Sequence, residues 1–305
     1  MGKWRRRILT ALSVIALFGG AAYYWFIIDS SPPLSGAYAV DMAEVRRLAD
    51  SLAGDKVAEV HNELVATYQF PATAAVAGDG WANIDIPVQS YQLVFPNHSG
   101  IIDTALDRLL AKGAKSFDPD AYERMIVAMD KASLILVTHE HFDHIGGLTR
   151  HPRFANIIGA TTLTKEQVDN PKDMAPTQLP AGPMRGYRPL MYDRYRALAP
   201  GIVLIKAPGH SPGGQMIYVK RADGTEFLFL GDVAWTLRNV ELARTRARFV
   251  TSFTIPDEDR NKVMLELAEL HRIHLAEPQL HMIPGHDPIV RAQALKTGLF
   301  IERFK

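Results

Sequence analysis

The stretch from Leu134 to Gly147 restricts what this chain can fold into more than any other part of its 305 residues. An apolar, strand-like segment at 134–137 runs directly into three histidines and one aspartate, which are His139, His141, Asp143 and His144. Neutral imidazole and carboxylate groups are metal ligands at neutral pH, and a loop that leaves a strand can turn them toward one point. Three of the chain's 11 histidines in so short a stretch indicate a metal site rather than scattered surface residues.

This stretch resembles the H-x-H-x-D-H signature of the metallo-β-lactamase-fold hydrolases. Further motifs of that family follow its order: a strand-D-T motif at 100–105, a G-H-S-P-G motif at 207–214, a strand-G-D motif at 228–233 and a final G-H motif at 282–287. The resemblance covers the chain from about Ala72 to its C-terminus. It implies an α/β protein with the four-layer αββα sandwich of the metallo-β-lactamase fold, here preceded by one transmembrane helix.

The resemblance also implies a ligand set for two metal ions. One ion would be held by His139, His141 and His210. The other would be held by Asp143, His144 and His286, and Asp232 would bridge the two. Two Zn²⁺ ions are expected, because His141 stands where the family's di-iron oxidoreductases carry a glutamate. Fe and Mn also suit imidazole and carboxylate ligands.

Roles for further residues follow from the same resemblance. Asp143 and Asp232 would orient the attacking nucleophile and shuttle its proton. Asp103, in the strand-D-T motif, would orient ligands through hydrogen bonds. The H-F-D-H and P-G-H-D spellings are most similar to the lactonase-type branch, but Trp235 stands where those lactonases often place a tyrosine against the substrate carbonyl. Trp235 and His98 are the candidates for contact with substrate.

The N-terminus carries a second strong pattern. Ile8 to Ile28 contains no charged residue, cations precede it at positions 3, 5, 6 and 7, and Asp29 follows it. A helix of that length spans roughly 31 Å, close to the hydrocarbon thickness of a bilayer. The positive-inside rule then predicts an N-terminus in the cytoplasm and a catalytic domain outside it, periplasmic or extracellular. A cleaved signal peptide, which would make the protein secreted, is the alternative. The apolar run is, however, longer than the hydrophobic region of a usual signal peptide.

Composition excludes several classes of protein. The chain has no cysteine, so disulfides, thiol catalysis and cysteine-ligated metal sites are excluded. The net charge of +1 includes the N-terminal cations, so the rest of the chain is net negative and does not favour nucleic acid. A small-molecule substrate and, through the N-terminal helix, the membrane are the expected partners.

The sequence divides into four predicted regions. A basic tail covers 1–7, a transmembrane anchor or signal 8–28, a linker with an N-terminal helical segment 29–71, and the hydrolase domain 72–305; the linker begins with the extended connection 30–33.

Apolar periodicity and acidic N-termini predict helices at 41–52, 118–131 and 257–275. Strands are expected at 74–77, 88–95, 134–137, 157–159, 201–206, 216–219 and 226–230. Residues 171–200, rich in Pro, Tyr and Arg, should form a long loop that either covers the metals or lies at the surface near lipid head groups.

We therefore expect a dinuclear zinc-dependent hydrolase that attacks an ester, lactone or lactam carbonyl with a metal-bridging hydroxide. Hydrolysis of a phosphodiester or sulfate ester by the same site is the alternative among enzymes. A non-catalytic metal-binding module at the membrane is the alternative from another class, and the complete ligand set argues against it.

Overall fold

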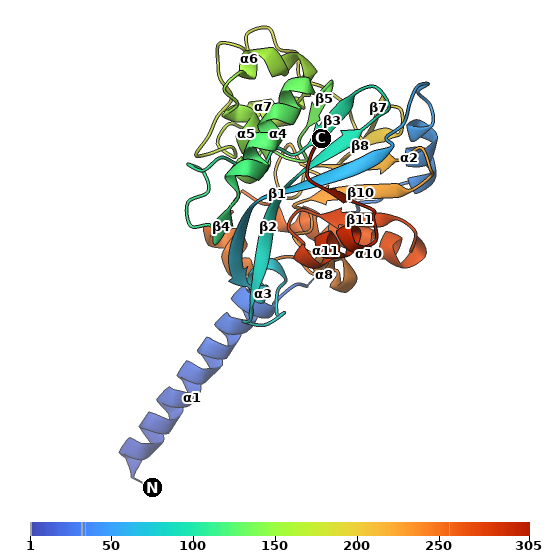
Figure 1. Cartoon of the computed structure of the whole chain (residues 1–305). Coiled ribbons are helices and arrows are strands. Elements are labelled where there is room, and N and C mark those ends of the chain that lie inside the picture. The colour runs from blue at the N-terminus through green and yellow to red at the C-terminus, as the bar shows by residue number, and fades with distance from the viewer. Residues whose placement is uncertain (1, 32, 34, 256) are drawn as a thin grey trace.

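The computed structural model of the chain describes residues 2–31, 33, 35–255 and 257–305. Met1 of the predicted basic tail and Pro32 of the predicted connection at 30–33 lie outside the described residues. Figure 1 shows an N-terminal helix that extends away from a layered domain. This helix, α1, spans Lys3–Tyr23 and continues as the π-helical turn η1, Tyr24–Ile28.

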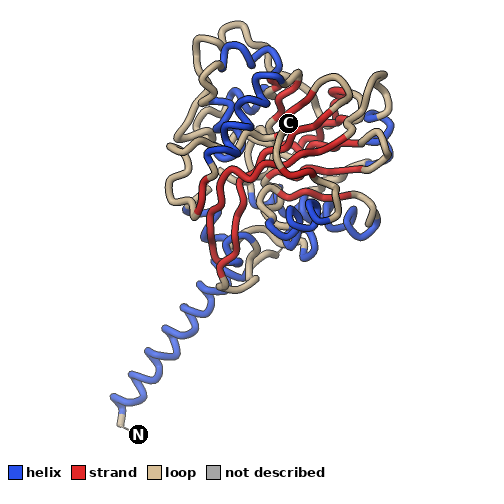
Figure 2. Tube along the Cα trace, viewed as in Figure 1, coloured by secondary structure: helices blue, strands red, loops and turns tan. Residues whose placement is uncertain are grey.

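Two mixed β-sheets form the centre of the domain (Figure 2). The first has the strand order β12-β1-β2-β3-β5-β6, with β4 paired to β1. Its strands are β1 Glu59–Pro71, β2 Asn83–Val94, β3 Ser99–Ile102, β4 Ser116–Phe117, β5 Leu134–Leu136, β6 Thr161–Thr162 and β12 Ile301–Glu302. The second has the order β11-β10-β9-β8-β7. Its strands are β7 Tyr195–Ala199, β8 Ile202–Lys206, β9 Gln215–Lys220, β10 Glu226–Gly231 and β11 His281–Pro284.

The two sheets bury apolar side chains against each other. One core cluster joins Leu93 and Ile102 of the first sheet to Leu204 and Phe229 of the second. Tyr91 of β2 meets Phe229 edge to face, with ring centroids 4.9 Å apart, which is a favoured geometry for aromatic pairs. Burial of this kind on both inner faces drives the sheets together.

Helices cover the outer faces of both sheets (Figure 1). Met125 and Met129 of α4 pack with Ile135 of the first sheet, while Leu267 and Leu270 of α10 pack with the second. The longer helices are α2 Met42–Ala49, α4 Pro119–Lys131, α5 Phe142–Thr149, α10 Arg260–Ala276 and α11 Pro288–Lys296. The shorter ones are α3 Ala72–Ala75, α6 Phe154–Ile157, η2 Ile158–Ala160, α7 Lys165–Asp169, α8 Leu237–Leu242 and α9 Arg248–Phe253. The layers are therefore αββα, as the sequence predicted.

Most of the expected elements are confirmed. The helix predicted at 118–131 is α4, whose N-terminus is capped by the Asp118 carboxylate, and the helix predicted at 257–275 is α10, which begins after the cap Asp259. The strands expected at 74–77 and 157–159 are wrong, because 74–75 end α3 and 76–77 form a turn, while 157–159 belong to the short helices α6 and η2. These apolar runs are too short to show a periodicity, and periodicity is what distinguishes a strand from a buried helical turn in a sequence.

Strand β1 lies in the stretch interpreted from sequence as linker and helical segment, and it was not predicted. Its buried residues include His61, Asn62 and Glu63, so it lacks an apolar alternation. Arg124 of α4 pairs with Glu63 at 2.7 Å, and Arg291 of α11 donates to Asn62 at 2.7 Å. Polar partners from distant helices thus make this strand possible.

The chain that follows α1 is attached to the domain. Asp29 is buried, and its carboxylate pairs with Arg248 of α9 at 2.6 Å. The hydroxyl of Ser30 accepts a hydrogen bond from the backbone N–H of Thr245 at 3.2 Å. The first residues after η1 are therefore bound to the surface of the domain. Lys3–Ile28 is long and apolar enough to cross a membrane, and every residue of α1 is exposed.

Candidate metal centre

The fold carries the predicted ligands to one end of the two sheets. β8, β10 and β11 run in the same direction, because β9 is antiparallel to both β8 and β10 and β11 is parallel to β10. His210 follows β8, Asp232 follows β10 and His286 follows β11. From the first sheet, β5 leads into the loop and the start of α5 that carry the remaining ligands: His139, His141, Asp143 and His144.

Four of these residues form one group with ligand atoms close enough to share an ion: His139, His141, His210 and Asp232. Nδ1 of His141 lies 3.1 Å from Nε2 of His139 and 2.9 Å from Nε2 of His210. Burial lowers the pKa of both His139 and His141 well below its ordinary value of 6.5, and neighbouring imidazoles lower it further. Neutral rings keep a lone pair for a cation.

Asp143, His144 and His286 form a second group. Nε2 of His144 lies 3.3 Å from Nε2 of His286, and Oδ2 of Asp143 lies 3.6 Å from the same His286 nitrogen. This set combines two imidazoles with one carboxylate, which suits a divalent transition metal.

Asp232 lies between the two groups. Toward the first group, its Oδ2 is 3.9 Å from Nε2 of His139 and 3.4 Å from Nε2 of His210. Toward the second, its Oδ1 is 3.2 Å from Nε2 of His144 and 3.1 Å from Nε2 of His286, and Oδ2 is 3.3 Å from the same His286 nitrogen. Among the described residues, the buried Oδ1 has no hydrogen-bond partner. A buried carboxylate oxygen without a partner, aimed at two ring nitrogens, fits a bridging metal ligand.

Hydrogen bonds behind the rings fix their orientation. Nδ1 of His144 lies 2.9 Å from Oδ2 of Asp103, and Nδ1 of His286 lies 2.9 Å from the carbonyl of Pro87. Asp103 is itself held by the backbone N–H of Thr138 at 2.6 Å. These contacts leave each Nε2 directed inward, the arrangement that supports metal-bound histidines. Asp103 thus lies where an orienting role requires it.

Sequence reasoning missed a buried ion pair behind His210. Oε2 of Glu258 lies 2.7 Å from Nδ1 of His210 and accepts a hydrogen bond from Nε of Arg246 at 3.0 Å. Arg246 is fully buried and also donates to the carbonyl of Asp232 at 2.9 Å. The pair therefore connects two of the ligands. Arg246 lies in a basic stretch at 238–248 that follows Asp232, and no motif marks either partner of the pair.

Glu140 is a second residue that the motif did not identify. It is buried and accepts hydrogen bonds from the Ser211 hydroxyl and from the backbone N–H of Gly213, both at 2.9 Å. Burial raises its pKa to about 7. A Cβ at Gly213 would clash with Glu140 and Gln167, so the motif requires glycine here to bring the two ligand loops together.

A cavity of about 380 Å³ opens onto both groups of ligands. Its apolar wall is formed by Tyr68, Phe70, Ile86, Phe142, Trp235 and Ile255. Trp235 contacts the centre directly, since its indole N–H donates to Oδ2 of Asp232 at 2.7 Å. The structure does not bring His98 to this cavity: its ring stacks on Phe95, 4.2 Å between centroids, in the turn before β3, whereas Asp103 follows the other end of that strand.

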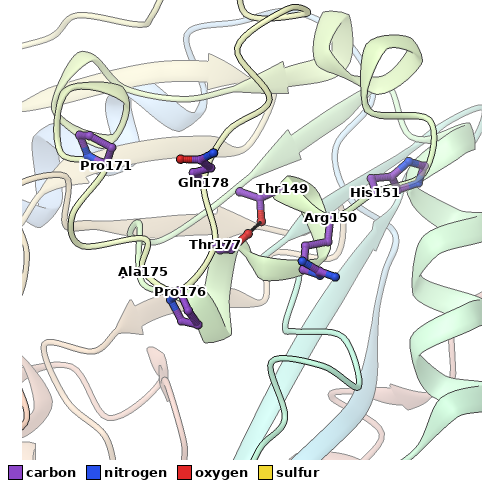
Figure 3. A pocket seen from close by; sticks show the side chains of 8 residues that line it. All are labelled: Thr149, Arg150, His151, Pro171, Ala175, Pro176, Thr177 and Gln178. Carbon is purple, nitrogen blue, oxygen red and sulfur yellow. Dashed lines mark hydrogen bonds between the residues drawn. The ribbon is translucent and has the colours of Figure 1, made fainter.

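The long loop predicted at 171–200 is wrong at its end, where 195–199 form β7 and pair with β8. Only residues near its start line the cavity, namely Lys172, Asp173 and Ala175. Its arginines at 185, 188, 194 and 196 are exposed. A larger cavity of about 750 Å³ lies on another side of this loop, where Thr149 and Thr177 are joined by a hydrogen bond of 2.7 Å (Figure 3). That cavity is lined by none of the ligand residues.

Comparison with known proteins agrees with this geometry. A model of the family described as the Metallo-beta-lactamase superfamily matches residues 101–273, more than half of the chain. No curated protein matches the sequence. Among solved structures, a quorum-quenching N-acyl homoserine lactone lactonase is 17% identical with a TM-score of 0.57, over 77% of this chain and 94% of its own.

Two further solved structures have the same overall shape. A probable metal-dependent hydrolase from Staphylococcus aureus is 15% identical with a TM-score of 0.58, over 76% of this chain and 91% of its own. A variant of the B. thuringiensis protein AiiA, with N-decanoyl-L-homoserine bound at its active site, is 17% identical with a TM-score of 0.58, over 78% of this chain and 96% of its own. At such identities the likeness concerns the fold.

Proposed function

The chain belongs to the metallo-beta-lactamase superfamily and is a metal-dependent hydrolase, and from this premise we propose that it uses two zinc ions to hydrolyse the carbonyl bond of an ester, lactone or lactam. The observation that carries the proposal is the position of Asp232. Its carboxylate lies 3.4 Å from His210 of one group and 3.1 Å from His286 of the other, so one carboxylate can serve two ions.

The chain's own residues have distinct parts in this reaction. Zinc, when bound, supplies Lewis acidity and lowers the pKa of water at the site. Asp143 and Asp232 hold the attacking water by hydrogen bonds, and Asp143, which is the more exposed of the two, receives its proton. Asp103 and Glu258 keep His144 and His210 in the required orientation. The aromatic wall at Trp235 and Phe70 excludes water from one side of the substrate.

The charges around the cavity favour a carbonyl substrate over a phosphodiester. Its lining includes the carboxylates of Asp173, Asp257 and Glu258, and its one lysine, Lys172, is paired with Asp257 at 2.9 Å. Glu258 is in turn paired with Arg246, so no lysine or arginine among the described lining residues is left unpaired, and an anionic ester would depend on the bound metal ions alone for charge compensation. An uncharged carbonyl group does not need that compensation.

The test is a parallel turnover assay of zinc-loaded protein with nitrocefin, an acyl lactone and bis(p-nitrophenyl) phosphate. We expect hydrolysis of the lactone or lactam and little of the phosphodiester. Turnover of the phosphodiester alone would replace the proposal with its enzymatic alternative. A protein that binds metal and hydrolyses none of the three would support the non-catalytic alternative.

We also propose that 8–28 remains in the mature protein as a membrane anchor, with the basic residues before it in the cytoplasm and the domain outside. The charge asymmetry across the run supports this orientation. The ion pair of Asp29 with Arg248 supports retention, since it attaches the end of the helix to the domain. Mass spectrometry of the membrane fraction should detect residues 8–21. A soluble mature protein that begins near Ala22 would show a cleaved signal instead.

A further inference from the structure

The end of the N-terminal helix and the domain share an exposed aromatic surface, which we call the aromatic collar: Tyr23, Trp25, Phe26, Trp81 and Phe253. Trp25 is 50%, Trp81 56% and Phe253 77% exposed. They come from η1, from the segment between α3 and β2, and from α9. A contiguous exposed surface of large aromatic side chains is unusual on a soluble domain and marks a contact with a partner or a membrane.

The collar is held together by contacts across these elements. The rings of Phe26 and Phe253 have centroids 6.5 Å apart, and Nε1 of Trp81 donates to the Tyr23 hydroxyl at 3.2 Å. Arg248 lies over the ring of Trp25, 3.8 Å from its centroid. The domain is thus attached to the helix on two sides, so the collar keeps a defined position at the end of the apolar run.

That position corresponds to the interface of a bilayer. If Ile8 to Ile28 spans the hydrocarbon, then Tyr23, Trp25 and Phe26 lie at its outer boundary, where aromatic residues are enriched. Trp81 and Phe253 contact this part of the helix, so they reach the same level. Figure 1 agrees, since α3 lies beside the end of α1.

The segments that carry the collar also supply part of the wall of the catalytic cavity. Phe253 is followed directly by Thr254 and Ile255, which line the cavity. On the other side, Phe70 is 40% exposed and its ring lies 6.5 Å from that of Trp235. The β1–β2 hairpin with its connection, and the end of α9 with the residues after it, therefore carry both collar residues and apolar residues of the cavity wall.

We infer that the cavity takes an amphipathic substrate from the membrane surface, with its carbonyl group at the metal centre and an apolar chain lying along Phe70 and Ile255 toward the bilayer. The inference rests on the proposed carbonyl hydrolysis. The occupant of the collar is the lipid bilayer, because the collar surrounds the point where the predicted anchor leaves the membrane.

The first test measures the depth of the collar without using activity. Because the natural chain has no cysteine, single Phe253→Cys and Leu275→Cys variants can each carry one NBD fluorophore. Leu275 is a matched control, because it is also an apolar side chain that is 70% exposed. It lies near the end of α10, shortly before β11 begins, whereas His286 follows the other end of β11. In phosphatidylcholine vesicles, nitroxide-labelled lipid should quench the label at 253 and not the label at 275. Equal quenching at the two positions would overturn the inference.

The second test measures the substrate. Full-length zinc-loaded protein in the same vesicles is assayed with p-nitrophenyl butanoate, which is water-soluble, and p-nitrophenyl dodecanoate, which partitions into lipid. Phe253→Ser should lower kcat/KM for dodecanoate about tenfold, because it removes a large apolar side chain between the bilayer and Ile255. It should leave the value for butanoate unchanged, and Leu275→Ser should alter neither.

The outcomes separate the two proposals. Turnover of butanoate with no advantage for dodecanoate and no effect of Phe253→Ser would contradict the membrane-derived substrate and leave carbonyl hydrolysis intact. Turnover of neither ester, nor of the lactone and lactam, would contradict carbonyl hydrolysis and remove the substrate inference with it. The label at 253 would still report whether the collar contacts lipid.

Discussion

The indole N–H of Trp235 donates a hydrogen bond to Oδ2 of Asp232 at 2.7 Å, so a residue expected to contact substrate also holds the residue proposed to bridge the metals. The ring of Trp235 stands edge to face on that of His286, with centroids 5.8 Å apart. One side chain therefore connects the wall of the cavity to the ligands. Its position follows from its spacing of three residues after Asp232, at the end of β10.

Trp235→Phe should weaken catalysis without removing the metals. The change keeps an aromatic wall and deletes one hydrogen bond to a carboxylate, which is worth about 1.5–3 kcal/mol, so kcat/KM should fall by about 10–100-fold. Steady-state kinetics and metal analysis of the same preparation give both values. An unchanged kcat/KM would mean that the indole N–H has no part in catalysis.

Asp232→Ala should cost more activity than Asp103→Ala. Asp232 faces both groups of ligands, whereas Asp103 acts through His144. Loss of an orienting partner of this kind lowers activity or metal affinity by about 10–100-fold. Each variant is assayed for turnover and for bound metal. Equal losses of activity at equal metal content would contradict the two roles.

Arg246→Met should destabilise the fold, because it leaves the carboxylate of Glu258 buried without its cationic partner. Both side chains are fully buried, and breaking one partner of such a pair costs about 3–5 kcal/mol in the free energy of unfolding. Urea unfolding measures the loss. The double variant with Glu258→Gln removes the unpaired charge and should recover part of it. If the double variant is no more stable than the single one, the loss comes from packing.

The carboxyl group of Glu266 gives a prediction for pH. Burial raises its pKa from 4.5 to about 8, although its Oε1 accepts a hydrogen bond from the backbone N–H of Gly209 at 3.0 Å. A group whose pKa is raised by folding binds a proton more tightly in the folded state. Its contribution to stability is therefore full below its unfolded pKa and is lost as the pH rises through the folded pKa.

Glu266→Gln keeps a hydrogen-bond acceptor and cannot ionise. Between pH 4.5 and about 8, the natural protein should lose unfolding free energy relative to this variant, and the difference should level off above that range. Urea unfolding of both proteins across this range measures the difference. Parallel stability curves would show that Glu266 does not titrate with a raised pKa.

The proposed ligands and one of their supports, Asp103, could be predicted from sequence, whereas the ion pair behind His210 could not. His210, Asp232 and His286 occur in short motifs, because metal coordination restricts residue type and the adjacent glycines restrict the backbone. At Gly285, for example, a Cβ would clash with Asp232. Arg246 and Glu258 belong to no such motif, since an arginine that is buried and one that is solvated look the same in a sequence.

In the fold, too, elements with a strong local pattern could be predicted, and elements that depend on distant partners could not. Predicted helices at 118–131 and 257–275 have long periodic patterns and carboxylate caps, and both are present. β1 was missed because the partners of Asn62 and Glu63 come from α11 and α4, far away in the chain. The strand predicted at 74–77 was wrong because a run of small apolar residues fits either a strand or a helical turn, and its first two residues belong to α3.

The number of metal ions per chain tests the central claim most directly. Full-length protein expressed with zinc supplementation, purified and dialysed against metal-free buffer, is analysed by inductively coupled plasma mass spectrometry, with Asp232→Ala prepared in parallel. The two groups of ligands joined by Asp232 predict close to two transition-metal ions per chain in the natural protein and fewer in the variant. One ion or none in the natural protein would contradict the dinuclear mechanism.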